Sequence, residues 1–303
     1  MTTELTQLRF AGGAPGFNLL PLFVAEEQGL FEKYGLEIEY SWLGSLDKAA
    51  SAVRDGDAHV ALTYPEGAIS DCIAGGDLRI IGANSLRVPM SLIVQPAIGS
   101  LAELRGKRIG TASLTGGTAI YVQMMLKREG LSYPADYEFV FAGLHTDRWK
   151  ALQDGEIDCA PQPAPWNFLA ERAGYRRLGE VNDVIGEMVF AAIVGNRTWL
   201  EQNEDTVRRL IAALSEAHDF VNDPANEAIT LPIYQSITVP DDLELAAEAL
   251  SYTRSMGMWP KNLRVSQAAL DSTAELMILS GLLAEENRAQ VADAFEASCL
   301  AAG

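Results

Sequence analysis

The sequence predicts an α/β fold with two lobes and a helical C-terminal region. Strand signals alternate with helix signals from residue 8 to residue 173, which is the pattern of βαβ units and a parallel sheet. A turn–strand segment at 55–61 is echoed at 154–160, which favours two similar lobes. The chain of 303 residues is long for one core and sufficient for two.

The first part of the chain contains four strand signals separated by helical patterns. Short apolar runs predict strands at 8–11, 36–43, 59–63 and 78–83. Apolar periodicity, capping residues and glycine stops predict helices at 17–34, at 45–54 and from 65 to about 75.

The alternation starts again after a continuous apolar run at 90–94. We expect strands at 108–111, 138–141 and 157–160, with helices at 118–128, 146–152 and 166–173. A second apolar run at 188–194 precedes a region that is almost wholly helical. If both runs cross between the lobes, lobe one comprises residues 1–90 and 190–303, and lobe two comprises residues 91–189.

The internal echo predicts which strand ends face each other. The segment DGDAHVA at 55–61 matches DGEIDCA at 154–160, and each is an acidic–glycine turn followed by a short buried strand. The match aligns Thr63 and Tyr64 with Gln162 and Pro163. We therefore expect these pairs at equivalent positions on the two lobes.

Charge and cysteine content exclude several classes of function. The net charge of −18 argues against a nucleic acid or an anionic membrane as partner, since both need a basic surface. Cys72, Cys159 and Cys299 are far apart and form no metal-binding pattern, so we expect neither a metal nor a cofactor. The first ten residues resemble no signal peptide, and no apolar run reaches membrane-spanning length. These features predict a cytoplasmic location, unless a leader has been trimmed from the sequence.

Several motifs resemble the type II superfamily of periplasmic binding proteins. They are EQGLFEKYGLEI at 27–38, DGD at 55–57, AGGDLRII at 74–81, LAELRGKRIG at 101–110 and GEID at 155–158. The resemblance is to the group that holds nitrate-, sulfonate- and taurine-binding proteins and the thiamine-pyrimidine-precursor synthases. It implies a small-molecule binding protein, with an ABC permease as partner if the chain is exported.

Ligands of open α/β sheets bind beyond the carboxyl ends of the strands. In this chain the loops at those ends are rich in aromatic, hydroxyl and amide side chains, which suit an aromatic or anionic organic ligand. The glycine- and hydroxyl-rich loop at 111–118 leads into a helix N-terminus, where backbone N–H groups favour an anion. The candidate contacts are Phe17, Asn18, Trp42, Tyr64, Asn84, Ser113, Thr115, Gly117, Thr118, His145, Arg148, Gln162 and Trp166.

Each of these residues also has a purely structural interpretation. Phe17 and Trp42 also suit core packing, and Ser113 or Thr115 also suits ordinary helix capping. Glu66 and His145 are the one acid–base pair that the fold would place across the cleft, which leaves open a lyase or decarboxylase acting on an aromatic or heterocyclic acid. A carboxylate in the first turn of a helix is favoured by the macrodipole in any case, and this is the stronger explanation of Glu66. The cysteine-rich motif and the cofactor lysine of the precursor synthase have no match in this sequence.

Overall fold

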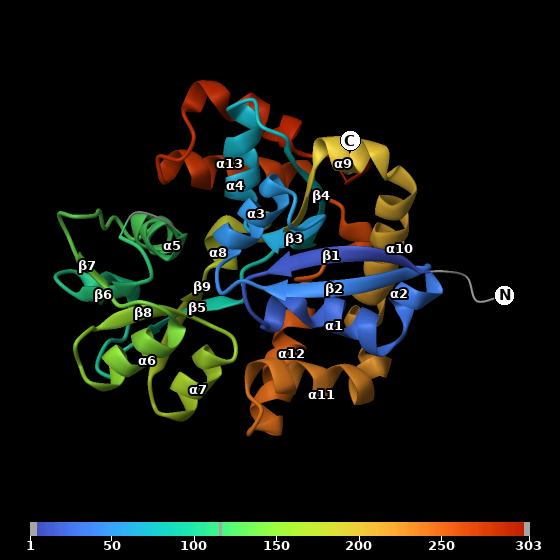
Figure 1. The fold of residues 1–303 in the computed structure, drawn as a ribbon. Helices are drawn as coiled ribbons and strands as arrows, with labels where there is room; N and C mark the ends of the chain where they lie inside the picture. The colour runs from blue at the N-terminus through green and yellow to red at the C-terminus, as the bar shows by residue number, and fades with distance from the viewer. Residues whose placement is uncertain (1–4, 115–116, 300–303) are drawn as a thin grey trace.

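The computed structural model describes residues 5–114 and 117–299, and these residues form two five-stranded sheets flanked by helices (Figure 1). The first sheet has the strand order β2-β1-β3-β10-β4, and the second has the order β7-β6-β8-β5-β9. The strands are β1 (Thr6–Gly12), β2 (Leu36–Trp42), β3 (Val60–Thr63), β4 (Leu78–Ser85), β5 (Met90–Val94), β6 (Arg108–Thr111), β7 (Glu138–Phe141), β8 (Cys159–Pro163), β9 (Arg176–Glu180) and β10 (Ala191–Asn196). Below, lobe one means the first sheet with the helices packed on it, and lobe two means the second sheet with its helices.

The helices follow the predicted alternation, and the C-terminal region is helical as expected. The α-helices are α1 (Leu20–Glu27), α2 (Leu30–Lys33), α3 (Leu46–Asp55), α4 (Pro65–Ile73), α5 (Gly117–Lys127), α6 (His145–Gln153), α7 (Trp166–Arg172), α8 (Asn182–Ile185), α9 (Arg197–Gln202), α10 (Glu204–Asn222), α11 (Glu227–Thr238), α12 (Leu243–Ser255) and α13 (Gln267–Leu279). Short 3-10 turns are η1 (Phe17–Leu19), η2 (Leu101–Leu104), η3 (Pro224–Asn226), η4 (Lys261–Leu263), η5 (Glu285–Ala294) and η6 (Ala297–Cys299).

The single helix expected at 17–34 is three elements, η1, α1 and α2. Gly29 interrupts it with a left-handed backbone conformation (φ 63°), which an α-helix cannot contain. The spacing of apolar residues continues across this break, because α1 and α2 both bury side chains against β1, β2 and α10. Periodicity alone therefore joined two helices that a glycine separates.

Each sheet is mostly parallel but contains antiparallel strands that the alternation did not indicate. In the first sheet β1 runs parallel to β2 and β3, whereas β10 lies antiparallel between β3 and β4. In the second sheet β6 runs parallel to β7 and β8, whereas β5 is antiparallel to β8 and β9. The parallel pairs agree with the predicted βαβ units, and the antiparallel strands β5 and β10 arise where the chain enters each sheet from the other one.

The chain passes between the two sheets twice. The crossings lie at 86–89, between β4 and β5, and at 181–190, between β9 and β10. The apolar run at 90–94 is itself β5 of the second sheet, and most of the run at 188–194 belongs to β10 of the first. The lobe boundaries predicted near residues 90 and 190 stay a prediction.

The two echoed segments make matching contacts. Arg9 on β1 donates from Nη2 to the carbonyl oxygen of Gly56 at 2.9 Å. Arg108 on β6 donates from Nη2 to the carbonyl oxygen of Gly155 at 2.8 Å. Both glycines have left-handed backbones, with φ of 82° and 69°, and each begins the turn into a central strand. The echo in the sequence therefore corresponds to a repeated βαβ geometry in the two lobes.

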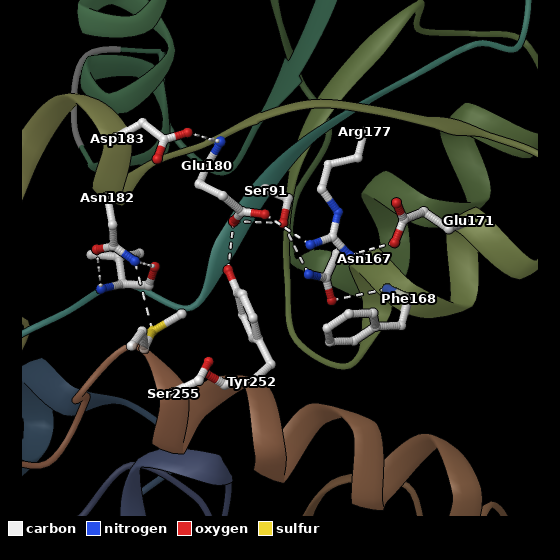
Figure 2. Close-up of polar contacts among 12 residues, drawn as sticks. Ser91, Asn167, Phe168, Glu171, Arg177, Glu180, Asn182, Asp183, Tyr252 and Ser255 are labelled. Atoms are coloured by element: carbon white, nitrogen blue, oxygen red, sulfur yellow. Dashed lines mark hydrogen bonds and ion pairs between the residues drawn. The ribbon is translucent and has the colours of Figure 1, made fainter.

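A polar and aromatic cluster joins lobe two to helix α12 (Figure 2). The Arg177 guanidinium of β9 lies 4.8 Å from the ring centroid of Phe168 and 5.9 Å from that of Tyr252 on α12. It also forms ion pairs with Glu171 and with Glu180, the latter at 2.8 Å. The Tyr252 hydroxyl donates to the same Glu180 carboxylate. We call these five residues the α12 contact.

Replacing Arg177 with Met should destabilise the protein by about 1–3 kcal/mol, because two partly buried carboxylates lose their charged donor. The matched control is Arg208→Met, since Arg208 forms an ion pair with Asp205 at the surface. That control should change the free energy of unfolding by less than about 0.5 kcal/mol. Urea denaturation of both variants, followed by tryptophan fluorescence, measures the difference. Equal losses in the two variants would contradict a special role for the α12 contact.

Candidate ligand-binding site

A cavity of about 380 Å³ lies at the carboxyl ends of β1, β2 and β3. This is the place where open α/β sheets bind their ligands, because the strand-to-helix loops converge there. The cavity is lined by Gly13, Ala14, Gly16, Phe17, Asn18, Leu19, Gly44, Ser45, Leu46, Asp47, Leu62 and Tyr64. Three of the residues predicted to contact a ligand, Phe17, Asn18 and Tyr64, are among them.

A hydrogen bond from the Asn84 side chain to the main chain of Asn18 holds one wall of this cavity. Asn84 at the end of β4 is buried, and its Nδ2 donates to the main-chain oxygen of Asn18 at 2.6 Å. This bond fixes η1 against the sheet. The side-chain Oδ1 of Asn18 is buried and has no hydrogen-bond partner among the described residues. An acceptor that is buried without a partner costs free energy, so this atom is available to a ligand donor.

Aromatic rings from lobe one and from the second crossing meet beside the cavity. Phe17 stacks on Phe190 with ring centroids 6.4 Å apart and an interplanar angle of 7°. Tyr64, just before α4, lies 6.0 Å from the same Phe190 ring. Phe190 belongs to the second crossing between the sheets. The aromatic wall is thus attached directly to the segment that links the lobes.

A carboxyl group with a buried oxygen follows Tyr64 in the first turn of α4. Glu66 Oε2 is inaccessible and has no hydrogen-bond partner among the described residues. Burial raises the pKa of this carboxyl, and the nearby Asp47 carboxylate adds to the effect. Burial and Glu66 likewise raise the pKa of the Tyr64 hydroxyl, whereas Arg148 opposes that rise. Lobe one therefore contributes acceptors and acidic groups.

Arg148 is the cation that lobe two places near this group. It is only 3% exposed and donates Nε to the Pro161 carbonyl at 3.0 Å and Nη1 to the Gly143 carbonyl at 2.9 Å. Burial lowers its pKa to about 10, so it stays charged at neutral pH. The positive charge of Arg148 opposes the rise that burial causes in the pKa of the Tyr64 hydroxyl, so this charge acts across the space between the lobes.

The other predicted contacts of lobe two cluster at the starts of α6 and α7. The His145 and Trp166 rings lie 5.2 Å apart at 45°. Burial and then Arg148 lower the pKa of His145, so its imidazole is neutral at pH 7. Gln162, at the end of β8, is fully buried, and both its amide oxygen and its amide nitrogen are without hydrogen-bond partners within the described part of the chain.

The loop before α5 is held by its own hydroxyl groups. Thr111 Oγ1 donates to the Ser113 carbonyl at 2.8 Å, and Thr118 Oγ1 accepts from the Ala112 N–H at 3.0 Å. Gly117 is the first residue of α5. Thr115 lies outside the described residues. The predicted anion contact at this helix N-terminus stays a prediction.

Trp42, which the sequence left open between a wall of the cleft and structural packing, lies among other aromatic rings, and its role as a ligand contact stays a prediction. Its ring stacks on Tyr40 at 5.6 Å and packs on Phe23 at 6.0 Å, and it is absent from the cavity lining. The ring also covers Gly12, where a Cβ atom would come within 2.5 Å of it. This arrangement is the structural alternative that the sequence left open.

Glu66 and His145 form no hydrogen bond with each other within the described residues. The acid–base pair proposed from the sequence stays a prediction. No group of three His, Cys, Asp or Glu side chains in the described ranges is arranged to hold a metal ion. Across the same ranges, no helix has the length and apolar character needed to cross a membrane.

Sequence reasoning missed three residues near the site. Asp47 lines the cavity in the first turn of α3. Tyr121 on α5 is buried, and Glu66 and Tyr64 both add to the rise in its hydroxyl pKa that burial causes, so lobe two also brings a phenol close to them. Tyr121 and Phe190 both stand in apolar runs that indicate core packing. Only Asp47, adjacent to a strand-end loop, carried a usable signal.

Glu66→Gln should stabilise the protein at about pH 8 and have little effect at about pH 3. Burial raises the pKa of Glu66 in the folded state above the unfolded-state value of about 4.3. The parent protein therefore loses stability as pH rises from about 4.3 through the folded-state pKa. A glutamine never ionises and escapes this cost. Urea midpoints of the variant and the parent at both pH values test the difference. Glu129→Gln, at an exposed position, serves as control, and a gap of the same size in both variants would contradict the assignment.

Comparisons with known proteins agree with this architecture. A family model described as NMT1/THI5-like matches residues 16–228. A protein of Brucella abortus that carries a provisional binding-protein name is 26% identical over 229 residues, covering 75% of this chain and 70% of the relative.

Solved structures share the fold at low identity. The periplasmic aliphatic sulphonate-binding protein of Escherichia coli superposes with a TM-score of 0.74 at 18% identity, covering 93% of this chain and 88% of that one. The periplasmic nitrate-binding protein of Synechocystis superposes with a TM-score of 0.73 at 13% identity, covering 97% and 86%. The type II periplasmic-binding-protein fold expected from the motifs is confirmed. Because the family model spans well over half of its length, the chain belongs to the NMT1/THI5-like family.

Proposed function

We propose that this protein is the substrate-binding component of an ABC importer and captures a small organic molecule between its lobes. The observation that carries the proposal is a set of buried polar atoms without partners at the converging strand ends. Asn18 Oδ1, Glu66 Oε2 and the Gln162 amide are all of this kind within the described residues. Buried polar groups in folded proteins are normally paired, so such a set is best explained by a ligand that pairs them.

The side chains favour a ligand with an aromatic or heterocyclic ring. Phe17 and Tyr64 offer ring faces in lobe one, and Trp166 offers one in lobe two. Aromatic pairs in offset or edge-to-face arrangements contribute about 0.5–1.5 kcal/mol beyond the area that they bury. A ring held between the two sets would gain from both only when the lobes are closed. That difference between states is what drives closure on a ligand.

The charges favour a ligand with donors on one edge and an acceptor or anionic group on the other. Asp47 and Glu66 stand on the lobe-one side, and Arg148 stands on the lobe-two side. A bare inorganic anion on the lobe-one side would be repelled by these two acidic groups. An anionic group on a larger organic molecule can instead be directed toward Arg148 and the start of α5.

Transport also implies a location outside the cytoplasm and a permease as partner. The sulphonate- and nitrate-binding proteins that share this fold are named as periplasmic. We extend that location to this chain as part of the proposal, in place of the cytoplasmic location expected from its first residues, which is not confirmed. Closure of the lobes would then be the signal that the permease recognises.

A thermal-shift screen of aromatic acids, sulfonates and pyrimidines should find compounds that raise the melting temperature, because a ligand that binds the folded state stabilises it. For each hit, Tyr64→Ala should weaken the Kd at least about tenfold by calorimetry, since it removes a ring from the site. The matched control is Leu243→Ala, because Leu243 is also exposed (53% against 44%) but lies at the start of α12, outside the cavity lining.

A hit that Tyr64→Ala leaves unchanged does not occupy the proposed site. If every hit behaves in this way, the proposed cleft is wrong. Steady chemical conversion of a hit by the purified protein would instead support the enzyme alternative.

A further inference from the structure

A second and larger cavity, of about 550 Å³, lies beside the C-terminal half of α5. It shares no lining residue with the cavity at the strand ends. Its volume falls in the range typical of small-molecule sites, about 300–1,000 Å³. It is lined by Ile120, Gln123, Met124, Lys127, Arg128, Leu131, Ser132, Tyr133, Tyr137, Val184, Glu275 and Leu279.

Tyr137 and Lys127 are lining residues whose side-chain polar atoms have no partner in the described part of the chain. Tyr137 is 4% exposed, and its hydroxyl oxygen is buried without a hydrogen-bond partner. Lys127, the last residue of α5, forms no hydrogen bond or ion pair there. A buried hydroxyl without a partner is costly, and a lysine at the mouth of an apolar hollow supplies a positive charge.

The neighbouring charged groups are already engaged. Arg128 donates to the carbonyl oxygens of Asp183 at 2.8 Å and Val184 at 3.3 Å. Glu275 accepts from Arg288 at 2.6 Å. Lys127 is therefore the lining cation that has no donor engaged in the described part of the chain. The paired Glu275 repels an anion less than a free carboxylate would.

Apart from Gln123 and Ser132, the remaining lining side chains are apolar or aromatic, and some of them are exposed. Leu279 is 47% exposed and Tyr133 is 40% exposed, and both line the hollow together with Met124 and Leu131. Tyr133 packs against Tyr137 and Phe139 in an aromatic cluster, with ring centroids 5.9 Å and 4.6 Å away. An aromatic body would bury these exposed surfaces.

We propose that this cavity is a second small-molecule site, and that it takes an amphiphilic monoanion with an aromatic body and one carboxylate or sulfonate group. Lys127 pairs with the anionic group, the Tyr137 hydroxyl donates a hydrogen bond, and Met124, Leu131 and Leu279 enclose the ring. The lining comes from α5 and residues 131–137 of lobe two, from Val184 in the second crossing, and from α13, which packs on lobe one. An occupant therefore contacts both lobes.

The test uses anilinonaphthalenesulfonate, a fluorescent aromatic sulfonate, titrated into the full-length protein. Lys127→Met should weaken its Kd about two- to fivefold, which is the value of an ion pair formed by an exposed lysine. Tyr137→Phe should weaken it about threefold through loss of one hydrogen bond. Leu279→Trp should abolish saturable binding by filling the cavity. Neutral phenylnaphthylamine, which lacks the sulfonate, should bind Lys127→Met as well as it binds the parent.

Two controls separate this site from the proposed cleft and from surface charge. Tyr64→Ala and Lys261→Met, an exposed lysine of lobe one, should both leave the Kd of anilinonaphthalenesulfonate unchanged. The proposal is overturned by an absence of saturable binding to the parent, by equal Kd values for Lys127→Met and Lys261→Met, or by loss of binding in Tyr64→Ala alone. Lys127 is at the surface, so its variant keeps the test valid even if Leu279→Trp fails to fold.

Discussion

The two crossings of the chain between its sheets are the constraint on which the rest of the arrangement depends. Each crossing brings a strand into the other sheet in the opposite direction to its neighbours. For this reason β10 lies antiparallel between β3 and β4, and β5 lies antiparallel beside β8. The remaining strands can then direct their carboxyl ends toward the space between the lobes. Phe190 sits in the second crossing, so the same segment that links the lobes also forms part of the aromatic wall.

The α12 contact bears on how far the lobes can move. Arg177 of lobe two is held between the rings of Phe168 and Tyr252 and between two carboxylates, so separating α12 from β9 would expose a charge cluster and two rings together (Figure 2). Interactions of this kind are strong because the partners are partly removed from water. Lobe motion is therefore expected to pivot about this contact and the adjacent crossings, which leaves the strand-end side free to open and close.

Sequence reasoning recovered the parts of the fold that local pattern encodes. Alternating strand and helix signals and the 55–61 and 154–160 echo predicted two α/β lobes, and the Arg9–Gly56 and Arg108–Gly155 bonds are the physical form of that echo. Strand direction was not recoverable, because an apolar run such as 90–94 has the same composition in either orientation. Strand β9 was missed because its sequence, RRLGE, has one apolar side chain and therefore shows no apolar alternation. For the site, strand-end position pointed to Asn18 and Tyr64, but Phe190 could be recognised only once the crossings were in place.

If the proposed cleft binds a ligand, its charge arrangement ties ligand capture to protonation. Burial raises the pKa of Glu66, so part of the unliganded population holds that carboxyl protonated at a pH where an exposed glutamate would be ionised. A ligand that donates an N–H to Glu66 Oε2 prefers the carboxylate form and therefore releases a proton when it binds. Arg148, whose pKa falls only to about 10, stays charged throughout that range and keeps its attraction for an acceptor on the other edge of the ligand. In the proposed cleft, the lobe-one half would thus respond to pH while the lobe-two half would not, and discrimination among ligands would depend on the donor edge of the ring.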